Sequence, residues 1–438
     1  MSTESEIARL PEPCNPASRL RFLQVFAGIG FLSFGGPAAQ IGLMHRKLVH
    51  ENKWLDEKAY LNALGFCMLL PGPEAMQLAT YAGWRMRGTL GGLVAGGLFI
   101  LPGAAVILLL SAVYARYGTL PLVQNTFVGI KAAVLIVVFE ALLRLSRRAL
   151  SGLDQWFIAG LAFVGIFFLS LPFPLIILAA GIYGALVGYR KVATSASLVP
   201  VHVSLRQTFQ TVLLWLLIWL VPLFLLGLFA NLPILAEIGT FFSKLAVVTF
   251  GGAYAVLAYM AQDIVTDYGW LTAGEMMDGL GMAETTPGPL ILVTQFVAFL
   301  AADRVGGLFF GVWGACVALW ATFVPCFLWI FAGAPYIEWI SAQPRLNAAI
   351  SAITAAVVGV VLNLSVWFAL HVLFTEVQHV QVGWLTLWIP DAASFDWRVL
   401  LLALAAGLGL LRFHVPLIYV LVFSAVGGIA LTVAASSG

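Results

Sequence analysis

Two short motifs of proline and glycine carry the clearest chemical signal in this sequence. Leu70-Pro71-Gly72-Pro73-Glu74 recurs 216 positions later as Thr286-Pro287-Gly288-Pro289-Leu290. Proline removes a backbone donor and clashes with the preceding turn, so each motif predicts a break in a helix. The helix that restarts after each break has free N–H groups and the positive end of its dipole, which favour an anion. We therefore expect an anion site built largely from backbone; the alternative is a kink without a ligand.

The same offset relates a longer stretch of the chain. Phe34-Gly35-Gly36 aligns with Phe250-Gly251-Gly252, and Trp54 aligns with Trp270. From residue 34 to residue 73 the two copies align without a gap, and 13 of 40 columns are identical. This similarity indicates an internal repeat. The Gly-Gly pairs predict a second pair of breaks, which serve either substrate binding or tight helix packing.

Charged and polar residues within apolar runs are further candidates. Glu74 and Glu284 flank the breaks and could carry protons; the alternative is a structural ion pair with Lys131, Lys244 or Arg85. Lys131 and Lys244 either balance a bound dianion or extend to the interface. The glutamines near the breaks either hydrogen-bond substrate oxygens or hold helices together.

The sequence thus gives two sets of candidate residues and no metal ligands. The candidate substrate-binding residues are Ser33, Gly35, Gly36, Pro37, Gln40, Pro71, Gly72, Pro73, Gln77, Lys131, Lys244, Thr249, Gly251, Gly252, Thr285, Thr286, Pro287, Gly288 and Pro289. The candidate proton-coupling residues are Glu74 and Glu284. The four cysteines are scattered and match no metal or disulfide spacing.

The composition indicates what holds these residues in place. The chain has 438 residues, of which 61% are hydrophobic and only 10% are charged, and its mean hydropathy is +0.99. A soluble core cannot accommodate so much apolar surface, so we predict an all-α polytopic membrane protein in contact with the lipid bilayer. The net charge of +2 gives no reason to expect a nucleic-acid partner. No phosphate-binding loop is present, and we expect neither a cofactor nor an enzymatic activity.

Hydrophobic runs predict about 13 spans. They lie at 21–43, 59–82, 89–114, 125–145, 155–171, 173–189, 207–229, 238–262, 274–301, 305–332, 346–372, 398–412 and 414–434. Seven spans separate the starts of the two copies, so the second copy would enter from the opposite side of the membrane. This arrangement is an inverted repeat with broken helices, as in many secondary transporters. We expect an N-terminal cytoplasmic tail at 1–20, a first repeat at 21–190, a linker at 191–236 and a second repeat at 237–438.

The distribution of basic residues agrees with a cytoplasmic N-terminus, with one exception. The segment that contains His45, Arg46, Lys47, Lys53 and Lys58 would lie outside or at the membrane surface if the first span crossed. Either this segment folds back beside the substrate path, or the first span is re-entrant.

These motifs resemble the chromate ion transporter family, in its long two-domain form. The resemblance covers most of the chain and is carried by Phe34-Gly35-Gly36-Pro37, Leu70-Pro71-Gly72-Pro73-Glu74, Leu101-Pro102-Gly103, Phe250-Gly251-Gly252 and Glu284-Thr285-Thr286-Pro287-Gly288-Pro289. It implies a multi-pass exporter of chromate in the bacterial inner membrane that confers chromate resistance, with two halves of opposite orientation. Sulfate has the same shape and charge as chromate and could share the path. Ala253 stands where the first copy has Pro37, so the two Gly-Gly breaks need not be equivalent.

The sequence therefore predicts a secondary transporter that expels chromate. The main alternative is a proton-coupled importer of sulfate or another tetrahedral oxyanion. A membrane enzyme is a weak alternative, because the chain has no Cys/His ligand set, no cofactor motif and no nucleophile–base pair. An ion channel is a further alternative, which saturation of the flux and counter-transport would rule out. A homodimer is compatible with the sequence, which does not specify the oligomeric state.

Overall fold

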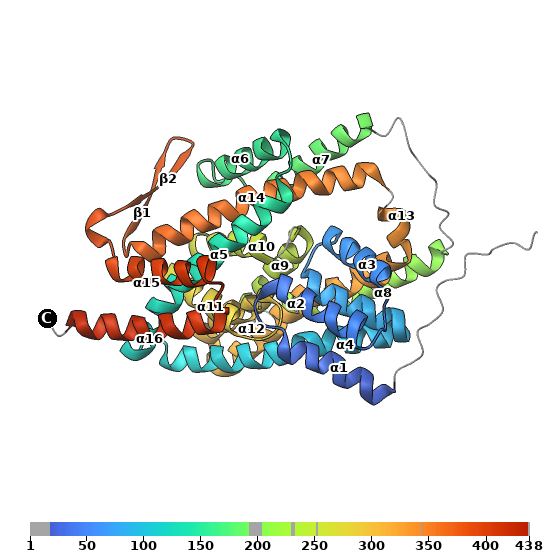
Figure 1. Ribbon diagram of the computed structural model, residues 1–438, viewed down its shortest axis with the longest axis horizontal. Helices are drawn as coiled ribbons and strands as arrows, with labels where there is room; N and C mark the ends of the chain where they lie inside the picture. Colours follow the sequence, from blue (N-terminus) through green and yellow to red (C-terminus); the bar gives the residue numbers. More distant parts are fainter. Residues whose placement is uncertain (1–17, 192–203, 229–232, 251–252, 342, 437–438) are drawn as a thin grey trace, which may run out of the picture.

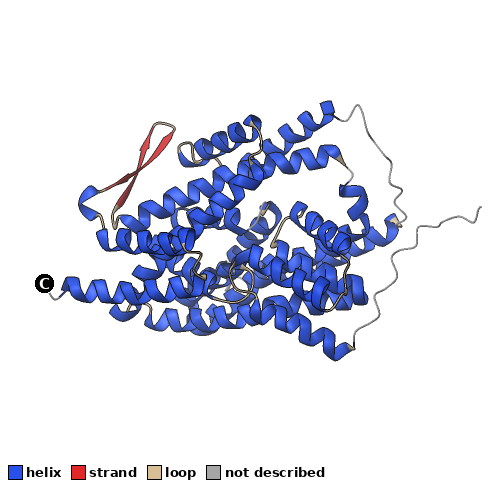
Figure 2. Ribbon diagram, viewed as in Figure 1, coloured by secondary structure: helices blue, strands red, loops and turns tan. Residues whose placement is uncertain are grey.

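The computed structural model describes residues 18–191, 204–228, 233–250, 253–341 and 343–436. These residues are mainly helical, with one two-stranded hairpin (Figures 1 and 2). The α-helices are α1 (Arg19–Leu32), α2 (Gly36–His45), α3 (Glu57–Leu69), α4 (Glu74–Tyr117), α5 (Pro121–Ala149), α6 (Leu153–Phe167), α7 (Phe173–Lys191), α8 (Leu205–Leu228), α9 (Pro233–Val248), α10 (Ala253–Thr266), α11 (Ala273–Thr285), α12 (Val293–Gly333), α13 (Ile337–Ser341), α14 (Pro344–Leu373), α15 (Trp397–Gly407) and α16 (Leu417–Ser436). The shorter elements are the π-helical segments η1 (Arg46–Glu51) and η6 (Leu408–Arg412), the 3₁₀ turns η3 (Leu290–Leu292), η4 (Ala334–Tyr336) and η5 (Ala392–Ser394), and the strands β1 (Val377–Val382) and β2 (Leu385–Pro390).

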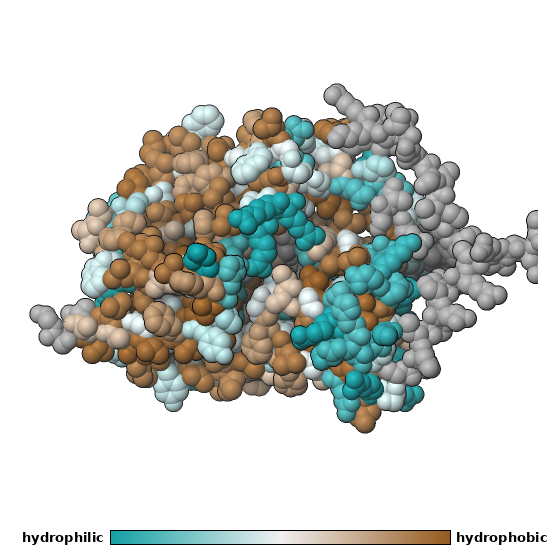
Figure 3. Space-filling view, viewed as in Figure 1, coloured by the Kyte–Doolittle hydropathy of each residue, from teal (hydrophilic) through white to brown (hydrophobic). Residues whose placement is uncertain are grey.

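Within the described residues, six helical stretches are long and apolar enough to cross a bilayer. They are Glu74–Tyr117, Pro121–Ala149, Leu205–Leu228, Leu290–Tyr336, Pro344–Leu373 and Leu417–Ala434. On the face shown in Figure 3 apolar residues predominate, and one large group of hydrophilic residues lies over α1, α2 and α3. The chain is therefore a multi-pass helical membrane protein.

Four of the expected spans are each divided into two shorter helices. In the first copy, the first span is divided into α1 and α2, and the second span is divided into α3 and the start of α4. In the second copy, the corresponding spans are divided into α9 and α10, and into α11 and α12. Gly72 and Gly288, the central residues of the two motifs, have φ values of +116° and +92°. A residue with a side chain rarely adopts such values, so glycine permits the break between the flanking prolines.

The helices α4 and α12 each reverse direction at a glycine. Gly88 has φ +65° and ψ −160°, and Gly307 has φ +74° and ψ −169°. The helical parts on either side pack closely: a Cβ on Gly83 would lie 2.3 Å from the carbonyl oxygen of Gly91. Each element is thus a helical hairpin, in which a short helix that begins at a Pro-Gly-Pro break is followed by a long one.

The long helical parts of α4 and α12 pack against each other in antiparallel directions. A Cβ on Gly92 would meet the ring of Phe331, and a Cβ on Gly96 would meet the ring of Phe327. The residue numbers rise along one helix and fall along the other. These two helices therefore run in opposite directions.

The chain returns to the beginning of α1 after α2 and η1. The indole of Trp54 lies 6.3 Å, between ring centroids, from both Phe22 and Phe26 of α1, and Arg21 donates to the side-chain oxygen of Asn52 at 3.2 Å. The first candidate span consequently folds back as a hairpin of two short helices, α1 and α2. This geometry favours the second of the two alternatives raised by the basic segment, because it places residues 45–58 on the same side as the N-terminal end of α1.

The second copy repeats this return. The indole of Trp270, at the position equivalent to Trp54, lies 5.7 Å from the ring of Phe241 in α9. Arg304, near the reversal in α12, donates to the carbonyl oxygen of Trp270. The helices α9 and α10 of the second copy are therefore followed by a return to α9, as α1 and α2 are followed by a return to α1.

The remaining helices surround this centre. α14 packs against α6 and α7 along one side, and α15 and α16 pack against α5 (Figure 1). The segment 373–397, which we expected to be an interfacial loop, contains the antiparallel pair β1–β2. Gly383 begins its turn with φ +64°, as a two-residue hairpin loop with glycine at its first central position requires.

Candidate functional site

The two Pro-Gly-Pro breaks each contact the first break of the opposite copy. The Gly72 N–H donates to the Thr249 carbonyl oxygen at 2.9 Å, and the Gly288 N–H donates to the Ser33 carbonyl oxygen at 2.9 Å. Gly288 follows Gly72 by 216 residues, and Thr249 follows Ser33 by the same number. The two hydrogen bonds are thus the same interaction made once by each copy, and they join the halves at their breaks.

Glutamine side chains brace both breaks. Gln77 donates from Nε2 to the Pro71 carbonyl oxygen at 2.6 Å. Gln40 donates from Nε2 to the Gly288 carbonyl oxygen at 2.7 Å and to the Ser33 carbonyl oxygen at 3.3 Å. Both of these side chains are buried, and their amide hydrogens hold the backbone of the break in place.

The hydroxyl groups near the breaks bond to their own helices. Ser33 donates to the Ile29 carbonyl oxygen at 2.6 Å, and Thr249 donates to the carbonyl oxygen of Leu245. The hydroxyls of Thr285 and Thr286 likewise donate to carbonyl oxygens three residues earlier. These hydroxyl protons stabilise the ends of α1, α9 and α11.

The helices that restart after the breaks begin without a side-chain cap. Pro73 precedes α4 and Pro289 precedes η3, and neither offers a side-chain acceptor. The first N–H groups of a helix have no partner within the helix. Because Gly72 and Gly288 use their own N–H groups in the contacts between the copies, and the prolines that follow have none, the donors left for a ligand begin two residues later, at Glu74 and Leu290.

The two glutamates that flank the breaks have different surroundings. Glu284 is buried and accepts a hydrogen bond from the Tyr254 hydroxyl at 2.9 Å. The same hydroxyl lies 3.9 Å from the position of a Cβ on Gly36, so it connects Glu284 to the first break of the other copy. Glu74 is the first residue of α4 and follows Pro73 directly.

Lys131 has a partner that the sequence analysis missed. Its Nζ lies 2.9 Å from Oδ1 of Asp278, and the Tyr114 hydroxyl donates to Oδ2 of Asp278 at 2.6 Å. The alternative in which Lys131 pairs with Glu74 or Glu284 is therefore wrong. Asp278 is an acidic residue within an apolar run, the same signal that singled out the two glutamates.

A cavity of about 520 Å³ lies beside this ion pair. Its polar lining includes Tyr114 near the end of α4, Lys131 of α5 and Asp278 of α11. Asp303 and Arg304, from the first part of α12, complete this polar lining. The lining combines basic and acidic groups, so the cavity is not a simple anion site.

The remaining candidates fall into three groups: some lie apart from the breaks, some form the first break, and some lie outside the described residues. Lys244 is exposed on α9, and Arg85 donates to the Tyr81 hydroxyl at 3.4 Å. Gly35, Gly36 and Pro37 form the break between α1 and α2, whereas Gly251 and Gly252 lie outside the described residues. The structure thus forms one group of contacts at each break. Pro71, Gly72 and Gln77 meet Thr249 at the first. Ser33, Gln40 and Gly288 meet at the second, where a Cβ on Gly103 would lie 2.2 Å from the Pro287 carbonyl oxygen.

This architecture, with broken helices from two copies meeting inside a helical bundle, is that of a multi-pass membrane transporter. The chain belongs to the chromate transporter family, whose model matches residues 20–185 and 236–429.

Several relatives support this assignment over most of the chain. A chromate transport protein from Cupriavidus metallidurans is 31% identical over 360 residues, which cover 79% of this chain and 82% of that protein. A chromate transport protein from Pseudomonas aeruginosa is 30% identical over 424 residues, which cover 93% of this chain and 94% of that protein. A probable chromate transport protein from Synechococcus elongatus is 30% identical over 348 residues, with coverage of 79% and 84%. No solved structure matches the chain.

Proposed function

We propose that this chain is a secondary transporter that exports chromate across the bacterial inner membrane and so confers chromate resistance. The observation that carries the proposal is the pair of equivalent hydrogen bonds by which each Pro-Gly-Pro break meets the first break of the other copy. The chromate named in the relatives supports the choice of substrate.

The proposal includes an inverted repeat. In it, residues 21–190 and 237–438 are the two repeats, 1–20 is a cytoplasmic tail and 191–236 is a linker. The antiparallel packing of the long parts of α4 and α12 supports opposite orientations. If the hairpins before Gly88 do not cross, five helical passes remain between that glycine and the second copy, from the long part of α4 through α8. Five is odd, so the inversion is retained.

We place the substrate at the two uncapped helix starts. A dianion at the beginning of α4 and at η3 would accept hydrogen bonds from the backbone N–H groups that follow Pro73 and Pro289, and the helix dipoles would favour its charge. Gln40 and Gln77 hydrogen-bond to the backbone of the breaks and so hold the N–H groups that bind the substrate in position. The residues of the Gly-Gly breaks line the same region in this proposal.

The membrane potential supports export as the direction. Each elementary charge that crosses is worth about 2.3 kcal/mol per 100 mV, so a dianion that leaves a cell with a negative interior gains roughly 4.6 kcal/mol per 100 mV. Export therefore proceeds downhill without a coupling ion, and protonation of Glu74 or Glu284 would regulate it rather than drive it.

The alternative is a proton-coupled importer of sulfate or another tetrahedral oxyanion. Import of a dianion requires about two protons merely to cancel the electrical term. The carboxyl groups of Glu74 and Glu284, next to the breaks, are the feature that favours this alternative.

Transport into inverted membrane vesicles distinguishes the two functions. Radiolabelled chromate and sulfate are offered separately, with and without an imposed pH gradient, and an empty-vector vesicle is the control. The proposal predicts chromate uptake that an interior-positive potential accelerates and that proceeds without a pH gradient. Sulfate uptake only by right-side-out vesicles, dependent on a pH gradient, would establish the importer instead.

A further inference from the structure

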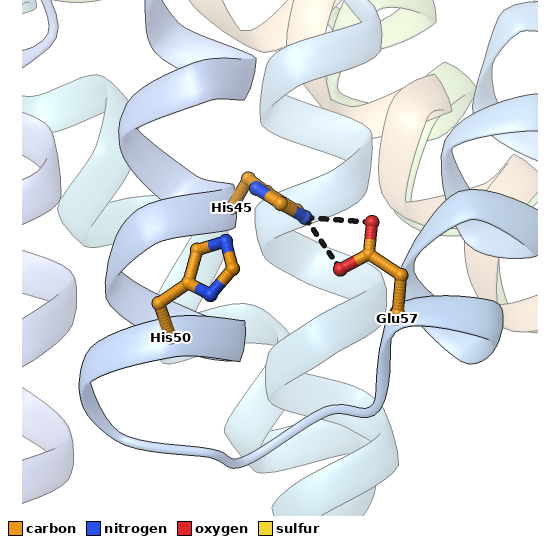
Figure 4. A group of neighbouring side chains, drawn as sticks. All are labelled: His45, His50 and Glu57. Carbon is orange, nitrogen blue, oxygen red and sulfur yellow. Dashed lines mark hydrogen bonds and ion pairs between the residues drawn. The ribbon is translucent and has the colours of Figure 1, made fainter.

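Two histidines and a glutamate meet at the open end of the first hairpin, where α2 leads through η1 to α3 (Figure 4). The Nε2 atom of His45 lies 2.9 Å and 3.0 Å from the two carboxylate oxygens of Glu57, and the ring centroids of His45 and His50 are 4.7 Å apart. One ligand atom from each of the three residues lies within 4.8 Å of the others. The three side chains come from α2, η1 and the first turn of α3 and converge on one point.

The π-helical segment η1 brings the two histidines onto one face. His45 and His50 are five residues apart, which in an α-helix would separate their directions by about 140°. The wider turn of η1, whose hydrogen bonds connect residues five apart, aligns them instead, as the bond from Asn52 N–H to the Lys47 carbonyl oxygen at 3.2 Å shows. Short π-helical turns are rare and are frequently found at functional sites.

Neighbouring residues fix the other side of the cluster. The Tyr60 hydroxyl donates to the Ile41 carbonyl oxygen at 2.7 Å, and the Tyr60 ring lies 5.0 Å from that of His45. Asp56 caps α3 by accepting from the Ala59 N–H at 2.7 Å, which sets Glu57 in the first helical turn. Both halves of the cluster are thus held by contacts that do not involve its ligand atoms.

The charges around the cluster partly cancel. Arg46 and Lys47 both pair with Glu51, at 3.5 Å and 2.7 Å. Lys53 and Lys58 are exposed at the ends of the loop.

We propose that His45, His50 and Glu57 bind one divalent transition-metal ion of the Zn²⁺ type, with solvent in the remaining coordination positions. Two imidazole nitrogens and one carboxylate oxygen are a ligand set that Zn²⁺ accepts, with metal–ligand distances of about 2.0–2.2 Å. At those distances neighbouring ligand atoms of a tetrahedral site are roughly 3.3 Å apart, which the His45–Glu57 pair already approaches. His50 and Glu57 are exposed, so their side chains have the freedom to close the remaining gap.

A bound ion would connect the two broken spans of the first copy. His45 and His50 belong to the hairpin of α1 and α2, whereas Glu57 begins the helix that leads to Gly72. The metal would therefore restrain α3, and with it the first Pro-Gly-Pro break, relative to the hairpin. None of the three residues is a candidate substrate-binding residue, so the proposal does not depend on the transported ion.

Zn²⁺ binding to the purified full-length chain tests the proposal. The protein is prepared in detergent without a polyhistidine tag, and Zn²⁺ is titrated by calorimetry and counted by elemental analysis. We expect one saturable site per chain, and an affinity at least about ten-fold lower in His50→Ala and in Glu57→Gln, since even loss of an outer-shell partner of a metal site costs 10–100-fold. His50 is exposed, so its replacement leaves the fold intact.

Glu51→Gln is the matched control, because it removes a carboxylate from the same π-helical segment without removing a proposed ligand. It should bind Zn²⁺ as the unaltered protein does. The melting temperature provides a second readout: Zn²⁺ should raise it in the unaltered protein and in Glu51→Gln but not in His50→Ala. Zn²⁺ binding that is absent, or that is equal in His50→Ala and the unaltered protein, would overturn the proposal.

Discussion

Gly72 and Gly288 are the residues on which the geometry of the two breaks depends. A Cβ on Gly72 would lie 2.8 Å from Sγ of Cys326 and 2.9 Å from Nε2 of Gln77, and a Cβ on Gly288 would lie 2.9 Å from Cδ1 of Leu292. Both positions also have positive φ. Crowding and backbone strain therefore act together at the two positions.

Replacement of either glycine by alanine should destabilise the protein. We expect Gly72→Ala and Gly288→Ala each to lower the free energy of unfolding by about 1–3 kcal/mol through backbone strain, with further loss from the close contacts. Thermal unfolding in detergent measures the effect. Gly97→Ala is the control, because nothing lies within 4 Å of a Cβ at this position; equal melting temperatures for all three variants would contradict the account.

Glu74 stands at the helix start where we place the substrate. A carboxylate there competes with a bound dianion, since two like unit charges 4 Å apart repel by about 4 kcal/mol at an effective dielectric constant near 20. Chromate should therefore bind best when Glu74 is neutral. We expect Glu74→Gln to bind chromate but to lose the response of transport to an imposed pH gradient.

Initial chromate uptake by inverted vesicles at two pH gradients measures this response. Glu376→Gln, on the exposed segment before β1, serves as the control and should keep the response of the unaltered protein. If Glu74→Gln also keeps it, then Glu74 interacts only with the first N–H groups of its own helix.

The ion pair of Lys131 and Asp278 gives a third prediction at this scale. The two side chains are 20% and 10% exposed, so loss of one partner leaves a largely buried charge. We expect Lys131→Ala or Asp278→Ala to lower the free energy of unfolding by about 1–3 kcal/mol, less than for a fully buried pair because a cavity adjoins it. The double variant Lys131→Ala with Asp278→Ala should lose less than the sum of the two single variants in a thermal unfolding assay, and a strictly additive loss would refute the pairing.

At the scale of elements, the sequence predicted the breaks but not the path of the chain between them. Proline and glycine within apolar runs are local signals, so the ends of α3 and α11 follow from the motifs themselves. The reversal at Gly88 depends on one pair of backbone angles, and the return of Trp54 to α1 depends on a contact between distant residues. Hydrophobic periodicity indicates that a segment is helical and apolar but not on which side it emerges.

Contacts between side chains of the site are also hard to predict from the sequence when the residues are far apart in the chain. The two glutamines were correctly placed near the breaks, whereas the partner of Lys131 lies almost 150 residues further along the chain. An ion pair between α5 and α11 requires knowledge of which helices are neighbours. For this reason Asp278 was missed although its sequence context resembles that of Glu284.

The re-entrant path predicts the side on which residue 53 is accessible. In a variant without native cysteines, Lys53→Cys should be labelled by a membrane-impermeant maleimide from the same side as Arg147→Cys, at the end of α5. Thr119→Cys, in the loop between α4 and α5, should be labelled from the opposite side. Labelling of Lys53→Cys together with Thr119→Cys would mean that the first span crosses the membrane.

At the scale of the whole molecule, the two copies are joined by hydrogen bonds at the breaks in their helices. Each break satisfies one of its N–H groups with a carbonyl of the other copy, so movement of one copy relative to the other must exchange these bonds. A repeat was evident from the sequence, but the crossed pairing was not, because an alignment of two copies does not say which residues touch. In the proposed function, the breaks are the centre of alternating access.

The central claim is that the two Pro-Gly-Pro breaks carry chromate, and initial chromate uptake by inverted vesicles from cells that produce Pro73→Ala or Pro289→Ala tests it most directly. Pro222→Ala is the matched control, because Pro222 lies inside α8, away from the breaks. With rates normalised to the amount of protein in the membrane, we predict a loss of about ten-fold or more in both break variants, corresponding to at least about 1.4 kcal/mol, and little change in the control. Normal uptake by both break variants would contradict the claim and show that the breaks are structural kinks.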